Sequence, residues 1–461
     1  MRVYHAGGHI VIRPARALLC GVILVSGLLG LSVLDGHPAT TQAGFQDSRA
    51  RPGGTVTGAA WATAPPFWLP VPPMRTRRAD LAATLGPDGR IYALGGFNAV
   101  EKYLKTAEAY DEHAGTWTPI ASIAVSRSAF DAVTGPDGRL YAISGYTGTT
   151  YTRAVEAYTP RLNRWVAVAD TVLPHPGTGA VTGPNGRIYV MGANAGRGMA
   201  ALEVYNPGDD RWIRLPDLLG TRGDFGIARG PDGRLYAIGG SPDSPYDLPV
   251  AEAYNTSTAR WTRLADMPTA RSALAAATGL DGRIYAIGGG PRRGAALGTV
   301  KAYNVQTGRW GTVVSLRAPR GGLKAVRGND GRIYALGGFG GSPPSGVRGT
   351  PITSSHYLNI VEAYGPLIHA TPRSVTAGSS VVLTGTNFAA SATVTVTWDA
   401  TPQGAVLTTG HTNRAGALLH PLRFHVPAGV RPGQYVVTAM DDRSRYPVTA
   451  PLTVSPRVSG P

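Results

Sequence analysis

One position recurs along the chain with a basic side chain that could bind an anion. It lies ten residues before each of six Asp-Gly or Asn-Gly turns. Its occupants are Arg78, Arg127, His175, Arg222, Arg271 and Arg320. The guanidinium group of arginine presents paired N–H donors that match the oxygens of carboxylates, sulfates and acidic sugars. These six side chains would form an anion site if they met in a ring, or they would brace loops by bonding carbonyls or nearby aspartates.

Acidic residues follow the same position two or four residues later, at Asp80, Asp131 and Asp224. In the other copies, most residues two or four positions after the basic residue are alanine or glycine. The residues between these positions are mostly apolar, such as Leu81 and Phe130. This alternation predicts a strand with one face in a core and the other on a channel. We therefore expect a wide channel lined by small residues, with the three aspartates below a basic rim that strengthens the local field.

The elements that would position these residues follow from an internal repeat. The turn is followed each time by an apolar strand, as in Asp88–Gly96, and the six copies are 47 to 49 residues apart. A Glu/Lys-X-Tyr step comes next, and in five copies a tryptophan stands seven residues after the tyrosine. This length suits four short strands with their turns. The sequence predicts six blades of a β-propeller over residues 62–365.

The tryptophan missing from the sixth copy is found at the other end of the repeats. Thr371 stands where that tryptophan is expected, while Trp68 lies 20 residues before the first turn, as in every other copy. Trp68 should therefore belong to the outer strand of the last blade. Closing the ring with an N-terminal strand removes open sheet edges.

The remainder of the chain indicates three further segments. Residues 366–461 hold short alternating strands such as 392–398, which predict an Ig-like β-sandwich, so the fold class is all-β. Residues 17–34 are apolar and follow Arg2, Arg13 and Arg16. Residues 1–43 are therefore interpreted as a signal peptide or an N-terminal membrane anchor, and 44–61 as a linker. We expect a secreted or cell-surface protein.

Several kinds of chemistry find no support in the sequence. Cys20 is the only cysteine, which excludes an intramolecular disulfide and cysteine-based zinc or iron-sulfur sites. We find no Gly-X-Ser-X-Gly, His-Glu-X-X-His, P-loop or dinucleotide-binding motif, and the ten histidines are scattered. The net charge of +16 comes without interleaved aromatic residues or a basic helix. We predict no cofactor, no metal and no nucleic-acid partner.

The repeated Gly-Gly after an apolar strand, followed by a tyrosine and a tryptophan seven residues apart, resembles the kelch family of β-propellers. The resemblance covers residues 62–365 and implies a binding or interaction role. In kelch proteins, arginines on the same face grip acidic peptides, which the resemblance implies for this ring as well. Side walls of that site would come from the second loops of the blades. Those loops contain Tyr146, Tyr151, Arg197, Tyr246, Arg292, Arg293 and the long segment Phe339–Asn359, which is either a wall or a disordered cover.

A kelch propeller followed by a sandwich is also similar to the layout of galactose oxidase. That resemblance implies a copper site in which a tyrosine is bonded to a cysteine, with histidine and tyrosine ligands. His411 would be likened to one ligand. Because Cys20 lies in the predicted export segment, the crosslink cannot form in the mature chain, and copper-radical oxidation is disfavoured.

The leading hypothesis is an exported bacterial-type protein that binds a glycan, an acidic small molecule or an acidic peptide segment at the channel mouth, or another protein. Membrane contact would come only through an uncleaved N-terminal helix. One alternative is an enzyme, because a six-bladed kelch ring resembles N-acetylneuraminate epimerase. The candidate proton carriers would then be Asp80, Asp131, Asp224 and His175. A purely structural envelope protein is the other alternative.

Overall fold

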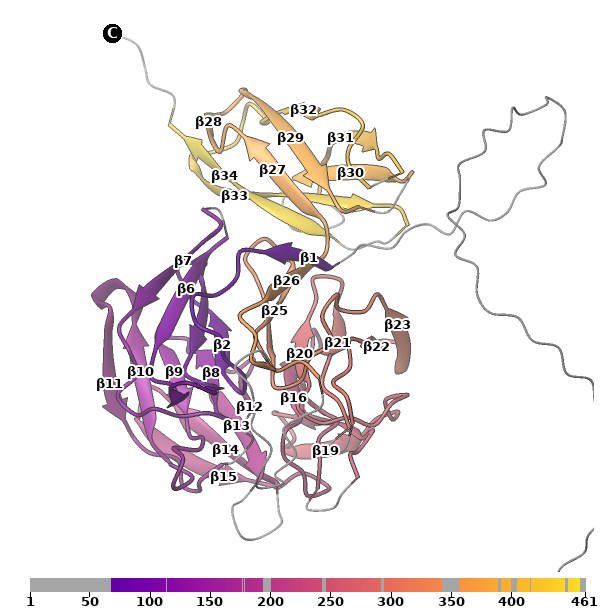
Figure 1. The fold of residues 1–461 in the computed structure, drawn as a ribbon. Coiled ribbons are helices and arrows are strands. Elements are labelled where there is room, and N and C mark those ends of the chain that lie inside the picture. The colour runs from indigo at the N-terminus through magenta and orange to yellow at the C-terminus, as the bar shows by residue number, and fades with distance from the viewer. Residues whose placement is uncertain are drawn as a thin grey trace, which may run out of the picture. The chain divides into compact units, whose positions relative to one another are not determined.

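The computed structural model describes residues 68–456, with gaps at 113, 176, 178, 194–199, 243–245, 292–293, 342–355, 389–390, 399–403, 415 and 444–446. The predicted export segment and linker, and most of the 339–359 loop, lie outside the described residues. Within the described part, no helix has the length and apolar character needed to cross a membrane. The described strands are drawn from indigo to yellow in Figure 1.

Six four-stranded antiparallel sheets form the blades in the described part of the chain. Blades one and two are β2(Ala82–Leu85), β3(Ile91–Leu94), β6(Ala107–Asp111), β7(Thr116–Ile120), and β8(Asp131–Thr134), β9(Leu140–Ile143), β10(Val155–Thr159), β11(Arg164–Val168). Blades three and four are β12(Gly179–Thr182), β13(Ile188–Ala193), β14(Ala200–Asn206), β15(Arg211–Leu215), and β16(Gly226–Arg229), β17(Leu235–Ile238), β18(Ala251–Asn255), β19(Arg260–Arg263). Blades five and six are β20(Ala275–Thr278), β21(Arg283–Ile287), β22(Val300–Asn304), β23(Arg309–Val313), and β24(Lys324–Arg327), β25(Ile333–Leu336), β26(Val361–Tyr364), β1(Trp68–Val71).

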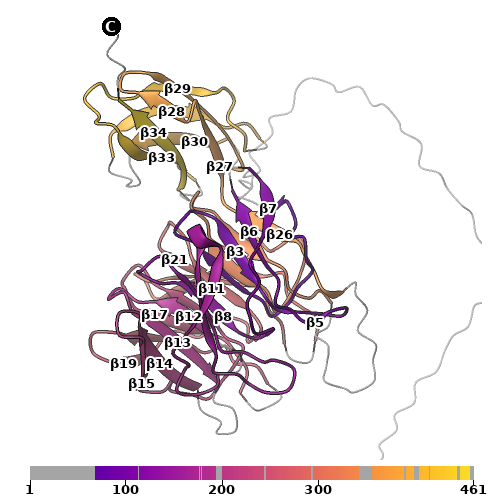
Figure 2. The same ribbon diagram turned by 90° about the vertical axis from the view of Figure 1, so that its left-hand side faces the viewer.

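The inner strands of the blades close a ring. In order, β2, β8, β12, β16, β20 and β24 each contact the next, and β24 contacts β2 again. Figure 2 shows the blades from the side. The predicted six-bladed propeller is confirmed.

The ring is closed by β1, as the position of Trp68 predicted. β1 pairs with β26, and Trp68 lies opposite Tyr364. The indole Nε1 of Trp68 donates a hydrogen bond to the carbonyl oxygen of Val314 at 3.0 Å. Because β1 covers the outer edge of blade six, every blade has four strands and no inner strand is left unpaired.

The repeated residues have local mechanical roles. In blade one, Gly89 adopts a φ of 77°, which completes the Asp-Gly turn between β2 and β3. Asp88 accepts hydrogen bonds from Arg90 Nε and from the hydroxyl of Tyr92, both at 2.7 Å. In five blades the turn arginine is held in this way by its own aspartate, on the face opposite to the start of the inner strands, and blade three has Asn185 in place of the aspartate.

Neighbouring blades share their hydrophobic cores. Tyr110 of blade one stacks on Trp117 with ring centroids 5.1 Å apart, and its ring also lies 6.0 Å from that of Tyr334 in blade six. The indole of Trp117 donates a hydrogen bond to the carbonyl of Pro72 at 2.9 Å. Large aromatic side chains thus join each blade to the one before it.

The C-terminal strands form two sheets around one core. They are β27(Leu367–Thr371), β28(Ser374–Thr376), β29(Ser380–Thr386), β30(Thr393–Trp398), β31(Val406–His411), β32(Leu422–His425), β33(Gly433–Asp441) and β34(Val448–Ser455). The sheet orders are β27-β29-β32 and β28-β34-β33-β30-β31. Val381, Val394 and Leu452 are buried in a core that both sheets share. This arrangement is a β-sandwich, as predicted.

Candidate functional site

The six basic residues of the repeat are buried, each with 0–2% of its surface exposed. In blade one, Arg78 Nη1 donates to the carbonyl oxygens of Gly95 and Thr106 at 2.8 Å, and Nη2 donates to Glu108 Oε1 at 2.7 Å. The guanidinium group therefore points into its own blade. The prediction that these side chains gather at the channel mouth is wrong for Arg78, Arg127, His175, Arg222, Arg271 and Arg320.

The carboxylate partner is a glutamate on the third strand of the blade. In five blades it stands two residues before the repeated tyrosine, as Glu108, Glu156, Glu203, Glu252 and Glu362. Glu108 also accepts the backbone N–H groups of Arg75 and Thr76, at 2.7 and 3.0 Å. Burial lowers the pKa of Arg78, and the charge of Glu108 opposes that shift. We call this arrangement the Arg–Glu brace, because it ties the loop between two blades to the third strand.

The glutamate of the repeated Glu/Lys-X-Tyr step was the sequence signal for the brace. The alternative that the arginines bond carbonyls agrees with these contacts. Their carboxylate partners, however, are glutamates of the third strand and not the nearby aspartates. In blade three the histidine takes the place of arginine, with His175 Nε2 lying 3.1 Å from Glu203 Oε1.

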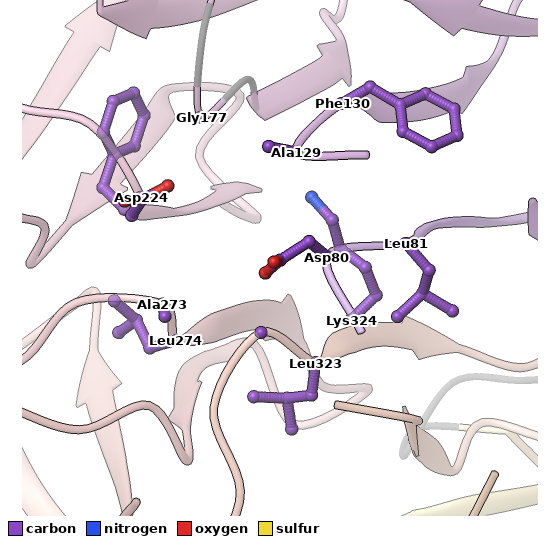
Figure 3. A pocket seen from close by; sticks show the side chains of 12 residues that line it. Asp80, Leu81, Ala129, Phe130, Gly177, Asp224, Ala273, Leu274, Leu323 and Lys324 are labelled. Carbon is purple, nitrogen blue, oxygen red and sulfur yellow. The ribbon is translucent and has the colours of Figure 1, made fainter. Parts of the chain in front are cut away.

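A second ring, two residues after the first, forms the floor of the channel mouth. Its members are Asp80, Ala129, Gly177, Asp224, Ala273 and Gly322, and all six have a φ between 50° and 61°. Their backbones bond from blade to blade: Asp80 N–H donates to Gly322 O at 2.8 Å, and Gly322 N–H donates to Ala273 O at 2.9 Å. All six residues line a cavity on the ring axis. Figure 3 shows Asp80 and Asp224 pointing into it.

The floor ring reads Asp-Ala-Gly twice around the channel, and the glycines make room for the carboxylates. A Cβ on Gly322 would lie 2.5 Å from Asp80 Oδ1, and a Cβ on Gly177 would lie 2.7 Å from Asp224 Oδ1. Each aspartate therefore leans over the glycine of the preceding blade. This pairing places two carboxylates in opposite blades, one and four.

Asp131 lies apart from the floor ring. Its carboxylate is buried and accepts the backbone N–H groups of Ala132 and Ala180, each at 2.9 Å. Lys324, which also lines the cavity, lies with Nζ 3.0 Å from Asp131 Oδ1. Of the three predicted aspartates, the structure brings Asp80 and Asp224 to the cavity and uses Asp131 to tie blade two to blade three.

The cavity is small and carries a perturbed acid. Burial, and then the charge of Asp224, raise the pKa of Asp80 to about 7, while Lys324 opposes the shift. The volume is about 50 Å³. One water needs about 10–15 Å³ of such space, so the cavity has room for a few water molecules.

Aromatic side chains surround one side of the mouth above this floor. The first residue after the Gly-Gly or Ser-Gly step is Phe97 in blade one, Tyr146 in blade two and Phe339 in blade six, but Ser241 and Gly290 in blades four and five. Phe97 and Tyr146 form β-bridges to Ala79 and Ser128, which directly precede floor residues. The aromatic side is therefore confined to blades six, one and two.

Further tyrosines of the same loops complete what we call the aromatic arc, which consists of Phe97, Tyr103, Tyr146, Tyr151 and Tyr357. Phe97 and Tyr103 lie on the short strands β4(Phe97–Asn98) and β5(Lys102–Tyr103). Ring centroids are 5.0 Å apart for Phe97–Tyr103, 5.5 Å for Tyr103–Tyr146, 4.9 Å for Tyr146–Tyr151 and 5.6 Å for Phe97–Tyr357. The sequence predicted Tyr146 and Tyr151 as walls of the site but not Phe97 and Tyr103. The signal for Phe97 was its position directly after the Gly-Gly step, which corresponds to that of Tyr146 in blade two.

The arc and the floor carboxylates are electrostatically linked. Burial, and then the charge of Asp80, raise the pKa of the Tyr357 hydroxyl to about 12. Burial, followed by Tyr146 and Asp224, also raises the pKa of Tyr151. The mouth thus combines aromatic faces with two carboxylates.

Other predicted wall residues are placed differently. Tyr246 is 77% exposed on the corresponding loop of blade four. Arg197, Arg292, Arg293 and residues 342–355 lie outside the described part of the chain.

The described residues do not fit the copper centre that the galactose oxidase layout would imply. They contain no group of three or more His, Cys, Asp or Glu side chains arranged to hold a metal ion. His411 is exposed at the end of β31, in the sandwich. The single cysteine of the chain, Cys20, lies outside the described residues.

Comparisons with known proteins find kelch motifs in this chain. A family model described as the kelch motif matches residues 81–123, 132–171 and 230–268. A search of curated protein sequences finds no match. A solved structure of a fungal alcohol oxidase of the AA5 family, in complex with copper, is similar at 17% identity, with a TM-score of 0.48 over 82% of this chain and 85% of that chain. The chain is therefore a six-bladed β-propeller that contains kelch motifs.

Proposed function

We propose that this protein is a binding module that holds a glycan at the mouth of its propeller channel. Kelch propellers serve binding and interaction in general. The observation that carries the more specific proposal is the aromatic arc, which stands beside the carboxylates of Asp80 and Asp224. Aromatic linings with a few convergent polar groups are typical of small-molecule sites, and Tyr151, at 43% exposed, is the most accessible ring of the arc.

The chemistry of the mouth favours a hydroxyl-rich ligand that is neutral or positively charged. Tyrosine rings offer flat apolar faces to the C–H groups of a sugar, and their hydroxyls form hydrogen bonds. The two floor carboxylates accept hydrogen bonds from sugar hydroxyls or from an amino group. The sugar would lie on the arc and extend a polar group into the cavity, which has room for a few water molecules.

The buried arginines give no support to an acidic ligand. Their donors are directed to carbonyls and glutamates, and among the described residues the charged groups that line the cavity are Asp80, Asp224 and Lys324. Lys324 is already paired with Asp131. An acidic sugar or acidic peptide would therefore face repulsion from the floor.

The test is calorimetric titration of the full chain with neutral, amino and acidic oligosaccharides. Tyr151→Ala should weaken binding about fivefold or more, because one aromatic contact contributes about 1 kcal/mol. Tyr151 is 43% exposed, so its loss should leave the fold intact. Tyr246→Ala is the matched control, because Tyr246 is a more exposed tyrosine on the blade-four loop, and it should bind as the wild type does. Equal binding by both variants, or binding of acidic sugars alone, would overturn the proposal.

A second candidate function rests on the pKa of Asp80. A carboxyl group with a pKa of about 7 beside a second carboxylate can donate or accept a proton at neutral pH. This favours an acid–base reaction of the epimerase kind on a sugar held at the arc, with Asp80 and Asp224 as the proton carriers. His175 and Asp131 are buried in other contacts, so we no longer include them among the candidate proton carriers. Anomer interconversion followed by NMR would be abolished by Asp80→Asn if this function is correct, and would persist unchanged if it is not.

We also propose that the protein is exported. The support is the apolar run 17–34 after Arg2, Arg13 and Arg16. Mass spectrometry of the protein from the medium and from membranes distinguishes the cases. A mature chain that starts near residue 44 indicates cleavage, full-length protein in membranes indicates an anchor, and full-length protein in the cytoplasm contradicts export.

A further inference from the structure

Blade five lacks one half of the Arg–Glu brace. On the third strand of the other five blades a glutamate stands two residues before the repeated tyrosine, but β22 carries Lys301 there. The arginine of the pair is still present as Arg271, and it is 0% exposed. A guanidinium group is thus buried in blade five without the carboxylate that accompanies it elsewhere.

The guanidinium group of Arg271 makes the same carbonyl contacts as that of Arg78 in blade one. Arg271 Nη1 donates to Gly288 O at 3.0 Å and to Thr299 O at 2.9 Å, as Arg78 Nη1 does to the equivalent Gly95 and Thr106. In blade one the next nitrogen, Nη2, meets Glu108. In blade five, Nη2 of Arg271 has no hydrogen-bond partner among the described residues. Its Nε is also unpaired, as it is in Arg78, Arg222 and Arg320, so Nη2 is the donor that sets blade five apart.

Lys301 does not replace the missing partner. Its Nζ donates to Thr312 Oγ1 at 2.9 Å, on the outer strand β23. The loop is altered at the same time, because Pro268 stands three residues before Arg271, where Arg75 of blade one offers its N–H to Glu108. Proline has no N–H to offer. Blade five therefore lacks both the carboxylate acceptor on the third strand and one of the backbone N–H groups that bind this carboxylate in the other blades.

We propose that a small monovalent anion, chloride or one of similar size, binds to the Nε and Nη2 groups of Arg271 in place of the missing carboxylate. These two N–H groups lie side by side on one edge of the planar guanidinium, the edge that holds anions with two hydrogen bonds. An unpaired buried charge is strongly unfavourable, so a counterion stabilises the fold. The full burial of Arg271 excludes a side chain of a partner protein as the anion.

Burial also lowers the pKa of Arg271, to about 10. The group is still charged at neutral pH and still requires compensation. In the other blades the glutamate supplies this compensation. The anion site is independent of the aromatic arc, and its failure would leave the glycan proposal untouched.

The experiment is thermal unfolding of the full chain at constant ionic strength, with sodium chloride exchanged stepwise for sodium gluconate, whose anion is too large for the site. Constant ionic strength keeps charge screening unchanged. The melting temperature of the wild type should rise with chloride in a saturable way, by about 1–3 °C, because the ion binds only the folded state. A melting temperature that is the same in both salts would overturn the proposal.

Two variants at one position make the test specific. Lys301→Glu supplies the carboxylate, so it should melt higher than the wild type in gluconate and lose its response to chloride. Lys301→Ala removes the lysine charge without adding a carboxylate, so it should keep the chloride response. An equal chloride response in Lys301→Glu and wild type would mean that the ion acts elsewhere, which contradicts the proposal.

A diffraction experiment gives a direct readout that does not depend on how the variants fold. Bromide replaces chloride and has an anomalous signal. Crystals of the full-length wild type grown or soaked in bromide should show an anomalous peak within hydrogen-bond distance of Arg271 Nη2. Bromide peaks only on the surface would overturn the proposal.

Discussion

The buried arginines have an architectural role, because four of them join a loop to a glutamate on the third strand of the blade. That glutamate lies 29 or 30 residues later in blades one, two and four, and 42 residues later in blade six. Arg127 donates to the carbonyls of Ser144 and Ala154 and pairs with Glu156. Glu156 in turn accepts the N–H groups of Ala124 and Val125. Removing one partner would leave the other charge buried and unpaired, which is more costly than the loss of the contact itself.

We expect Arg127→Ala to destabilise the protein by about 3–5 kcal/mol for this reason. The measurement is urea unfolding followed by tryptophan fluorescence. The double variant Arg127→Met, Glu156→Gln should lose less than the sum of its two single variants, since it removes both charges. Additive losses would show that the two side chains do not act as a pair.

Asp80 illustrates the opposite case, an acid that is favoured in its neutral form. Its pKa is about 7 in the folded state and 3.8 in the reference state, so folding favours the protonated carboxyl. The stabilising contribution is fully present below about pH 4 and is lost as the pH rises to about 7 and beyond.

Asp80→Asn should therefore be more stable than the wild type at pH 8, by about 1–3 kcal/mol once partial solvent screening is included. Near pH 4 the difference should largely vanish. Melting temperatures between pH 4 and 8 measure it, with the exposed Asp266→Asn as a control that should follow the wild type. A parallel pH dependence in Asp80→Asn and wild type would show that Asp80 is not the titrating group.

At the scale of elements, β1 is the strand that closes the propeller. Trp68 is 1% exposed, stacks 5.3 Å from Tyr364 and donates to Val314 O. These contacts span the whole propeller sequence, from its beginning to blades five and six. A short four-residue strand therefore has a large influence on the ring.

Trp68→Ala should cost about 3–5 kcal/mol, because it removes a large buried side chain and its hydrogen bond. Trp261→Ala is the matched control, since Trp261 occupies the same repeat position in blade four and is only partly buried. We expect its cost to be clearly smaller in the same chemical unfolding assay. Equal costs for the two substitutions would mean that ring closure gives Trp68 no special importance.

At the scale of the whole molecule, stability is shared between blades. One core cluster combines Leu81 and Tyr110 of blade one with Tyr334 and Val361 of blade six, and another combines Tyr141 of blade two with Tyr205 of blade three. A blade taken alone has only parts of two cores. This indicates that the ring forms as one cooperative structure.

Residues 62–215, which hold blades one to three, should therefore show no cooperative thermal transition when produced alone, and should bind a dye for exposed apolar surface. Addition of residues 216–461 should restore a transition and reduce dye binding. Circular dichroism and dye fluorescence measure both effects. A sharp transition in the isolated fragment would contradict shared stability.

The repeat determined the architecture from the sequence alone, because its information is local and appears six times. The spacing of the turns, the tyrosines and the tryptophans predicted the blades, and the displaced Trp68 predicted the closing strand. The alternation of apolar and small residues also placed Asp80 and Asp224 on the channel correctly. Each of these features depends on residues close in the chain or on simple counting.

The direction of the arginines was decided only by tertiary structure. The chain turns through a left-handed residue directly after the arginine loop, at φ values of 50° for Asp80 and 51° for Ala273. Alanine adopts such angles rarely, and although aspartate does so more often, residue type alone does not reveal the turn. That turn leaves Arg78 facing a glutamate 30 residues later. The proposed site at the mouth therefore consists of tyrosines and carboxylates, and the arginines are part of the core.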